Sequence, residues 1–309
     1  MHYSSDLKAT LSASSLAEEK IIAELYGFLH GAGNLSFFAR GRPVLSFSSD
    51  NASVARRYYG LIKDIFGYTP FFSVDKSKTA RRSNRYRLDF TDEVYSREIL
   101  SFYNLFSPYD NAFHLDTDPF FLTTTPDKTS YLKGLFLGCG YISPPKKSYH
   151  IQFSLHVEAR AKYLIELLTS FDIKANMARR GKYISVYIKN RESIAVFFAL
   201  IGAHQAMLDF ENILILKDIR NSTTRLINSE TANIHKTINS AEVQMRAIEK
   251  IAKQKGLTWL KPQLYEAAQL RLAHPTAPLS ELCEYFSPKI SRTAAYNRYK
   301  KILTLADEL

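Results

Sequence analysis

The stretch Leu25-Tyr-Gly-Phe-Leu-His-Gly-Ala-Gly33 has a second copy later in the chain, Leu132-Lys-Gly-Leu-Phe-Leu-Gly-Cys-Gly140. Both copies follow the pattern apolar-x-Gly-apolar-apolar-x-Gly-small-Gly, so one supersecondary unit occurs twice. In each copy two glycines stand four residues apart, and on a helix this spacing leaves one face bare. We therefore expect two equivalent helices, one from each half, that pack closely together. Their interface glycines are Gly27, Gly31, Gly134 and Gly138.

The elements around the motif follow the same order in both halves. Apolar periodicity and turn residues predict α-β-β-α-β-β-α over residues 14–105 and again over residues 127–205. Hairpins that lie between helices indicate antiparallel sheets covered by helices, which is an α+β arrangement. Equivalent basic loops, at Arg81-Arg82 and Arg179-Arg180, support a duplication. We assign residues 1–211 to this duplicated domain.

The pattern changes after Glu211. Residues 212–239 are polar and rich in Asn, Ser and Thr, which predicts a linker, with helices resuming near Ser240. Two short helices then follow a supporting helix and are separated by the turn Ser287-Pro-Lys-Ile290, with Ser291 as the cap of the last helix. This arrangement predicts an all-α helix-turn-helix domain over residues 240–309.

The last helix has two different arcs at about 100° per residue. Ala295, Tyr299 and Ile302 share an apolar arc that we expect to face the domain core. The opposite arc is polar and basic, which is typical of a helix that binds DNA bases and phosphates. The alternative is a solvated basic face on an ordinary helical hairpin. The candidate DNA-binding residues are Lys289, Ser291, Arg292, Thr293, Tyr296, Asn297, Arg298, Lys300 and Lys301.

The composition supports a folded protein with a polyanionic partner. The chain has 309 residues, 46% of them hydrophobic, and a formal net charge of +11. Such a charge favours nucleic acid, although an anionic membrane surface is an alternative. The two cysteines, Cys139 and Cys283, form no ligand cluster or disulfide framework, which indicates a reducing compartment. With no signal peptide or bilayer-spanning run recognised, we expect a cytoplasmic, nucleoid-associated protein without metal or cofactor.

With these motifs in place, the chain resembles the WhiA family of bacterial transcriptional regulators over nearly its whole length. The matching stretches include Gly31-Ala-Gly33, Tyr131–Gly140, Ile201-Gly-Ala-His204, Glu230-Thr-Ala-Asn233 and Leu270–Pro275. The resemblance implies a degenerate LAGLIDADG homing-endonuclease scaffold fused to a helix-turn-helix. It also implies sequence-specific transcriptional regulation in cell division, chromosome segregation or sporulation.

The same resemblance implies that catalytic acids are missing. Homing endonucleases of this fold place one acid before the last Gly of each glycine helix, where the pair binds divalent metal. Here those positions are Ala32 and Cys139, and neither residue supplies a hard oxygen ligand. Glu24 lies two turns back and cannot replace Ala32. We predict that the protein is not an enzyme; the alternative is an active or re-purposed endonuclease.

The partner of the first domain is left open. Double-stranded DNA is the expected partner of the chain, and basic residues of the first domain are candidates for auxiliary phosphate contacts. The alternatives are a sensor module for a ligand, a docking site for another transcription regulator or RNA polymerase, or solvated surface charge. The oligomeric state is open as well. The auxiliary candidates are Arg81, Arg82, Arg85, Arg179, Arg180, Lys182 and Arg225, and we also considered Arg56 and Arg57.

Overall fold

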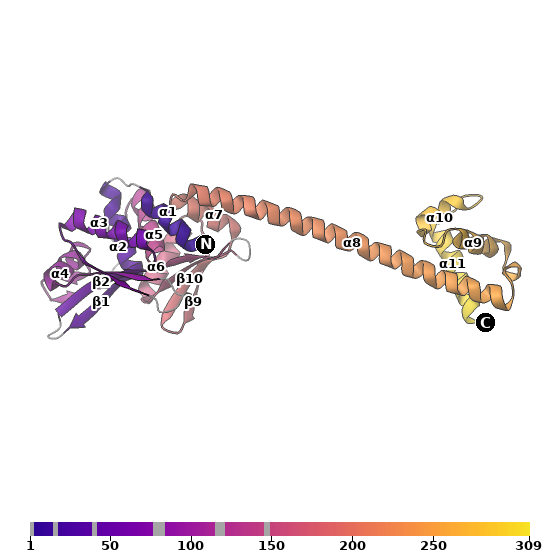
Figure 1. Ribbon diagram of the computed structural model, residues 1–309, viewed down its shortest axis with the longest axis horizontal. Coiled ribbons are helices and arrows are strands. Elements are labelled where there is room, and N and C mark those ends of the chain that lie inside the picture. The colour runs from indigo at the N-terminus through magenta and orange to yellow at the C-terminus, as the bar shows by residue number, and fades with distance from the viewer. Residues whose placement is uncertain (1–2, 15–17, 39–41, 77–83, 115–120, 145–148) are drawn as a thin grey trace. The chain divides into compact units, whose positions relative to one another are not determined.

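The computed structural model describes the chain except for residues 1–2, 15–17, 39–41, 77–83, 115–120 and 145–148. The chain divides into two compact units, Met1–Ile215 and Leu216–Leu309, and each is described by itself. Figure 1 shows the elements in chain order. Within the described residues, no helix combines the length and the apolar character that crossing a membrane requires.

The first unit contains the two equivalent halves. The first half contains α1 (Tyr3–Ala13), α2 (Glu18–Ala32), β1 (Gly33–Phe38), β2 (Arg42–Ser49), α3 (Ala52–Phe66), β3 (Phe71–Asp75), β4 (Arg85–Asp89), α4 (Glu93–Phe102) and the short hairpin β5 (Phe106–Ser107) and β6 (Ala112–Phe113). The second half contains α5 (Thr125–Cys139), β7 (Gly140–Ile142), β8 (Ile151–Leu155), α6 (Glu158–Thr169), β9 (Ala175–Arg180), β10 (Tyr183–Ile188) and α7 (Arg191–Leu200).

The two four-stranded sheets have the same antiparallel topology. Their strand orders are β1-β2-β4-β3 and β7-β8-β10-β9, so the predicted duplicated α+β fold is confirmed. Successive side chains of a strand point to opposite faces of the sheet, so alternate residues face the helices. Leu45 and Phe47 on β2 and Phe153 on β8 are buried against the helices. Gln152 and Ser154 alternate with the buried residues of β8 and are half-buried on the other face.

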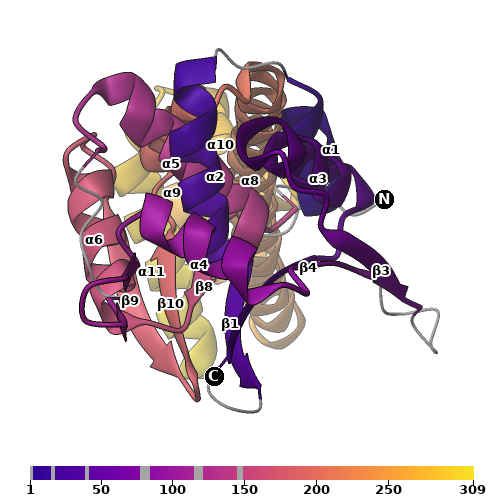
Figure 2. The ribbon, with the colours of Figure 1, turned by 90° about the vertical axis from the view of Figure 1, so that its left-hand side faces the viewer.

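Helices α2 and α5 lie side by side at the centre of the unit (Figure 2). Side-chain caps fix where two of the helices begin. The Asn51 side chain accepts hydrogen bonds from Ser53 N and Val54 N at the start of α3. Thr124 and Asp127 form a reciprocal capping box at the start of α5. One helix, α1, was not predicted; it packs on α3 and β7.

The prediction that helices resume near Ser240 is wrong. A single helix, α8, runs from His204 to Gln254 and includes residues 212–239. The segment contains neither Gly nor Pro, and its hydroxyl side chains bond within the helix. Thr223 Oγ1 donates to Ile219 O at 2.9 Å, and Thr237 Oγ1 donates to Asn233 O at 3.0 Å. Polar composition therefore did not imply irregular structure here; a linker role for this helical segment stays a prediction.

The second unit is helical throughout its regular elements. The carboxyl-terminal part of α8 packs with the shorter helices around a core that includes Ile248, Leu264 and Leu282. The short elements are η2 (Leu257–Trp259), α9 (Pro262–Ala273), α10 (Leu279–Tyr285) and α11 (Arg292–Asp307). The predicted all-α helix-turn-helix fold is confirmed.

Candidate nucleic-acid interface

Helix α11 is fixed by its cap and by its inner face. The Ser291 side chain accepts a hydrogen bond from Ala294 N at 3.2 Å and so caps the first turn. Ala295 and Ile302 are fully buried. The Tyr299 hydroxyl donates to Ala267 O at 3.0 Å, which joins α11 to α9. The orientation of α11 in its unit is therefore set by buried contacts on one side only.

The opposite face of α11 is open to solvent. Tyr296 keeps 54% of its surface exposed, although it is a large aromatic residue. Base edges and phosphates are recognised by side chains of these types on such a face. The exposed candidates are Lys289, Ser291, Arg292, Thr293, Tyr296, Asn297, Lys300 and Lys301.

Arg298 has a different environment from the other candidates. Its Nη1 forms an ion pair with Glu266 Oε2 at 3.0 Å, and its Cζ lies 4.9 Å from the ring centroid of Phe286. Glu266 Oε1 also accepts from Ser287 N at 3.0 Å. These contacts join α9, α10 and α11 at the turn. The geometry gives Arg298 a positioning role, which the helical arcs of the sequence did not indicate.

Lys289 also has an acidic neighbour, Glu284, with which it forms an exposed ion pair. Exposed pairs of this kind contribute little to stability because water screens them. A DNA phosphate can therefore replace the Glu284 carboxylate at small cost. The sequence shows no acid between Ser287 and Lys301, but the tertiary structure brings Glu284 and Glu266 to this surface from α10 and α9.

A buried arginine positions the helix-turn-helix, and sequence reasoning gave it no role. Arg271 is 1% exposed. Its Nε donates to Gln244 Oε1 at 3.0 Å, and its Nη1 donates to Ala277 O at 2.6 Å. Burial lowers the pKa of the Arg271 guanidinium. Its Cζ lies 5.3 Å from the ring centroid of Tyr299. Arg271 thus connects α8, α9 and the loop before α10, and only its place in the stretch Leu270–Pro275 drew attention to it.

The described auxiliary candidates of the first unit come from both four-stranded sheets. Arg85 is exposed on β4, whereas Arg179 and Lys182 belong to the β9–β10 hairpin, with Lys182 Nζ 5.3 Å from the Tyr183 ring centroid. Arg180 is the last residue of β9. Arg81 and Arg82 lie outside the described residues. In the second unit, Arg225 is exposed on α8, and its Nε donates to Asn221 O at 3.3 Å.

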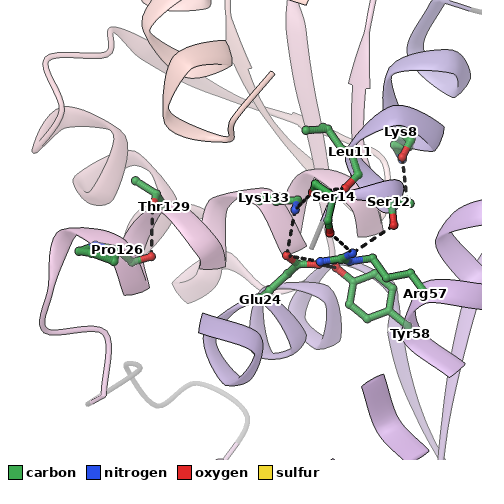
Figure 3. Close-up of polar contacts among 10 residues, drawn as sticks. All are labelled: Lys8, Leu11, Ser12, Ser14, Glu24, Arg57, Tyr58, Pro126, Thr129 and Lys133. Carbon is green, nitrogen blue, oxygen red and sulfur yellow. Dashed lines mark hydrogen bonds and ion pairs between the residues drawn. The ribbon is translucent and has the colours of Figure 1, made fainter. Parts of the chain in front are cut away.

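Arg57 is not available for phosphate contact, so that hypothesis is wrong. Its side chain is 9% exposed, and its Nε lies 2.5 Å from Glu24 Oε1 (Figure 3). Glu24 itself is fully buried and also pairs with Lys133 Nζ at 3.3 Å. The Tyr58 hydroxyl donates to the same carboxylate at 3.3 Å. Arg56, the residue before Arg57, is exposed.

The paired glycines bring the backbones of α2 and α5 together. A Cβ atom at Gly27 would lie 2.1 Å from Tyr131 O. Gly31 and Gly138 also lie at the contact but with more room, because a Cβ atom at either position would meet a backbone nitrogen of the other helix at 3.0 Å. No side chain fits at the first position without a shift of the backbone. The close approach places the ends of the two helices, Ala32 and Cys139, beside each other.

The divalent metal that the fold resemblance implies does not fit this site. The Ala32 side chain offers no donor atom, and burial raises the pKa of the Cys139 thiol to about 12. Magnesium requires oxygen ligands, and a protonated thiol supplies none. The Glu24 carboxylate is held by Arg57 and Lys133 on another part of the interface. The residues at the end of the glycine helices therefore do not reproduce the paired carboxylates of a nuclease.

Comparison with known proteins identifies the family. Family models match residues 18–106 as the WhiA N-terminal LAGLIDADG-like domain, 128–220 as the WhiA LAGLIDADG-like domain and 223–306 as the WhiA C-terminal HTH domain. The boundary between the last two falls within α8.

Whole-chain relatives agree with the family models. A protein of Thermoanaerobacter sp. (strain X514) named "Probable cell division protein WhiA" is 36% identical over 313 residues, covering 100% of this chain and 98% of that protein. A protein of the same name from Clostridium perfringens is 34% identical, covering 95% and 93%. The crystal structure of full-length DUF199/WhiA from Thermatoga maritima matches with a TM-score of 0.58 at 25% identity, covering 100% and 99%. The chain belongs to the WhiA family of cell division proteins, with a LAGLIDADG-like fold and a helix-turn-helix domain.

Proposed function

We propose that the protein is a sequence-specific DNA-binding regulator of transcription that acts in cell division, and that α11 reads the DNA. The observation that carries the proposal is the composition of the open face of α11, which is basic and polar and lies opposite a fully buried apolar face. A helix-turn-helix presents the amino-terminal part of its second helix to base edges in the major groove.

The open face supports separate roles for its residues. Arg292 and Asn297 carry the side chains that pair with guanine and adenine, respectively; they are about 1.4 turns apart, and both are exposed. Lys300 and Lys301 are suited to phosphate contacts, which position the protein without reading sequence. Lys289 joins them from the turn before α11.

We further propose that the first unit does not cleave DNA. Ala32 and Cys139 support this, because the positions at the ends of the glycine helices lack carboxylates. The direct test is incubation of the purified protein with supercoiled plasmid and Mg²⁺ or Mn²⁺. Persistence of supercoiled plasmid is the expected result, and metal-dependent nicking that copurifies with the protein through a final sizing step would reject the proposal.

Genome-wide occupancy mapping of the full chain tests the regulatory proposal. We expect discrete sites upstream of genes, a shared sequence motif and altered transcription of those genes when the protein is removed. Arg292→Ala combined with Asn297→Ala should remove the discrete sites. The matched control is Arg246→Ala on α8, whose side chain is 80% exposed and lies outside α11. Unchanged occupancy in the double variant would contradict the assignment of α11.

A further inference from the structure

A cavity lies at the carboxyl-terminal ends of α2 and α5. Its volume is about 790 Å³, within the range of cavities that hold small-molecule ligands. Ala32 and Cys139 form part of its wall, together with residues of α1, β2, β4, β8 and β10. The cavity therefore occupies the junction of the two halves, where the LAGLIDADG-like fold has lost its paired acids.

Helix α1 contributes one face to the cavity. Ser4, Ser5 and Lys8 line it, and the spacing of three and four residues places them on the same side of the helix. Ser4 Oγ accepts from Ile142 N at 3.2 Å, in the second half of the unit. Ser5 O accepts from Asn51 Nδ2 at 2.8 Å, in the first half. Contacts to both halves thus fix α1 against the cavity, and Lys8 forms part of the cavity wall.

Lys8 is buried to an unusual degree for a lysine. It is 7% exposed, and its Nζ lies 5.8 Å from the ring centroid of Phe136. Within the described part of the chain, its ammonium forms no hydrogen bond or ion pair. Burial lowers its pKa, and the charge of Asp50 offsets only part of that effect. The Nζ atom is nevertheless not among the fully buried polar atoms that lack a partner, so it remains accessible from the cavity. An ammonium with little exposed surface and no bonded partner at a cavity wall points to an anionic ligand.

The other basic and hydroxyl groups of the cavity wall favour an anionic ligand. Arg85 and Arg87 from β4 line the same cavity, although Arg87 is already paired with Asp89 at 2.9 Å. Ammonium, guanidinium and hydroxyl groups are the donors that bind phosphate oxygens. Two carboxylates, Asp50 and Asp75, also line the wall. The hydroxyl donors come from Ser4, Ser5, Ser46, Ser48, Ser49 and Ser154.

We propose that this cavity binds a phosphate group, held by the Lys8 ammonium with Arg85 and serine hydroxyls, at the place of the lost metal centre. The phosphate belongs either to the backbone of DNA on the open face of the sheets or to a phosphorylated small molecule. The proposal does not depend on DNA reading by α11, because every group it uses lies in the first unit.

The test compares the full chain with Lys8→Met, which keeps the length of the side chain and removes its charge. Calorimetric titrations use inorganic phosphate and ATP as probes. A second arm measures fluorescence anisotropy of a random-sequence duplex, with Arg292→Ala and Asn297→Ala present in every protein so that α11 contributes little.

Lys63→Met, a change at an exposed lysine on α3, is the matched control for charge alone. Thermal melting reports folding, and Arg85→Gln replaces Lys8→Met if that variant does not fold.

We expect Lys8→Met to weaken binding about tenfold in one arm, while Lys63→Met leaves it unchanged. Loss of phosphate or ATP binding identifies a phosphorylated small molecule. Loss of duplex affinity without small-probe binding identifies the DNA backbone. Equal binding by the wild type and Lys8→Met in both arms overturns the proposal, and so does an equal loss in Lys63→Met. If the Arg292→Ala and Asn297→Ala protein still occupied its genomic sites, only the proposal that α11 reads DNA would be contradicted.

Discussion

Gly134 lies against the backbone of Glu24, and a Cβ atom on Gly134 would stand 1.9 Å from the Glu24 carbonyl oxygen. Real Cβ atoms do not approach an oxygen so closely, so any side chain here separates α2 from α5. The glycine spacing therefore determines how closely the two halves of the first unit pack.

Gly134→Ala should destabilise the protein strongly. Overpacking of a tight interface costs about 1–3 kcal/mol. The added Cβ would meet backbone atoms of α2, which cannot rotate away as a side chain can, so we expect a loss at or above the upper end of that range. Gly60→Ala is the matched control, because nothing lies within 4 Å of its added Cβ and Gly60 is within α3. Alanine in that helix should stabilise by about 0.5–1 kcal/mol. Chemical denaturation of both variants should give changes of opposite sign, and equal changes would contradict the packing argument.

Glu24→Gln should destabilise the first unit by about 3–5 kcal/mol, because it leaves two buried cations without their counter-charge. Arg57 and Lys133 have 9% and 6% of their side chains exposed. Adding Lys133→Met to Glu24→Gln should recover part of the loss, since it removes one of the stranded charges. Urea unfolding of Glu24→Gln, Lys133→Met and the double variant measures this coupling. Additive losses in the double variant would show that Lys133 and Glu24 do not interact.

Arg292→Ala and Asn297→Ala should each lower affinity for a genomic site by about tenfold while changing affinity for random duplex much less. Lys300→Ala should weaken both kinds of binding and reduce the salt dependence by about one phosphate contact. Anisotropy titrations over a range of salt separate these effects. If Arg292→Ala weakened all duplexes equally, Arg292 would be a phosphate contact and not a reader of bases.

Arg298→Ala should reduce stability and DNA affinity together. The Arg298 guanidinium, 19% exposed, bridges Glu266 and the Phe286 ring, so its removal loosens α11 from α9. Glu266→Gln, which removes no positive charge, should lower the melting temperature in the same direction and weaken DNA binding as well. A stable Glu266→Gln variant with unchanged binding would instead place Arg298 on the DNA.

The Cys139 thiol should react slowly at neutral pH. Burial raises its pKa to about 12 in the folded state from an ordinary value of 9.0. Below pH 9 the thiol is protonated in both states and its contribution to stability is complete; it is lost as the pH rises from about 9 towards 12. Cys139 is partly exposed in the cavity wall, so iodoacetamide labelling followed by peptide mapping should modify it in the native protein much more slowly than after unfolding. Modification of the native protein at pH 8 as fast as that of the unfolded protein would reject the assigned environment.

The sequence by itself determined the features that depend on neighbours along the chain. Four-residue glycine spacing predicted the bare faces of α2 and α5, because helical geometry alone sets which residues share a face. The same geometry separated buried Ala295 and Tyr299 from exposed Arg292 and Asn297. Ser291 capped α11 where it was expected, since the cap bonds to a residue three positions later.

Tertiary structure decided the features that depend on which elements meet. Periodicity does not show that Glu24 pairs with Arg57 and Lys133, because those charges come from other helices. It does not place Lys8 beside the ends of α2 and α5, or Glu266 against Arg298. The continuity of α8 was also missed, because its polar side chains are satisfied by carbonyl groups of the preceding turn. A side chain's charge is local information, whereas its partner and its exposure are fixed only when distant segments pack.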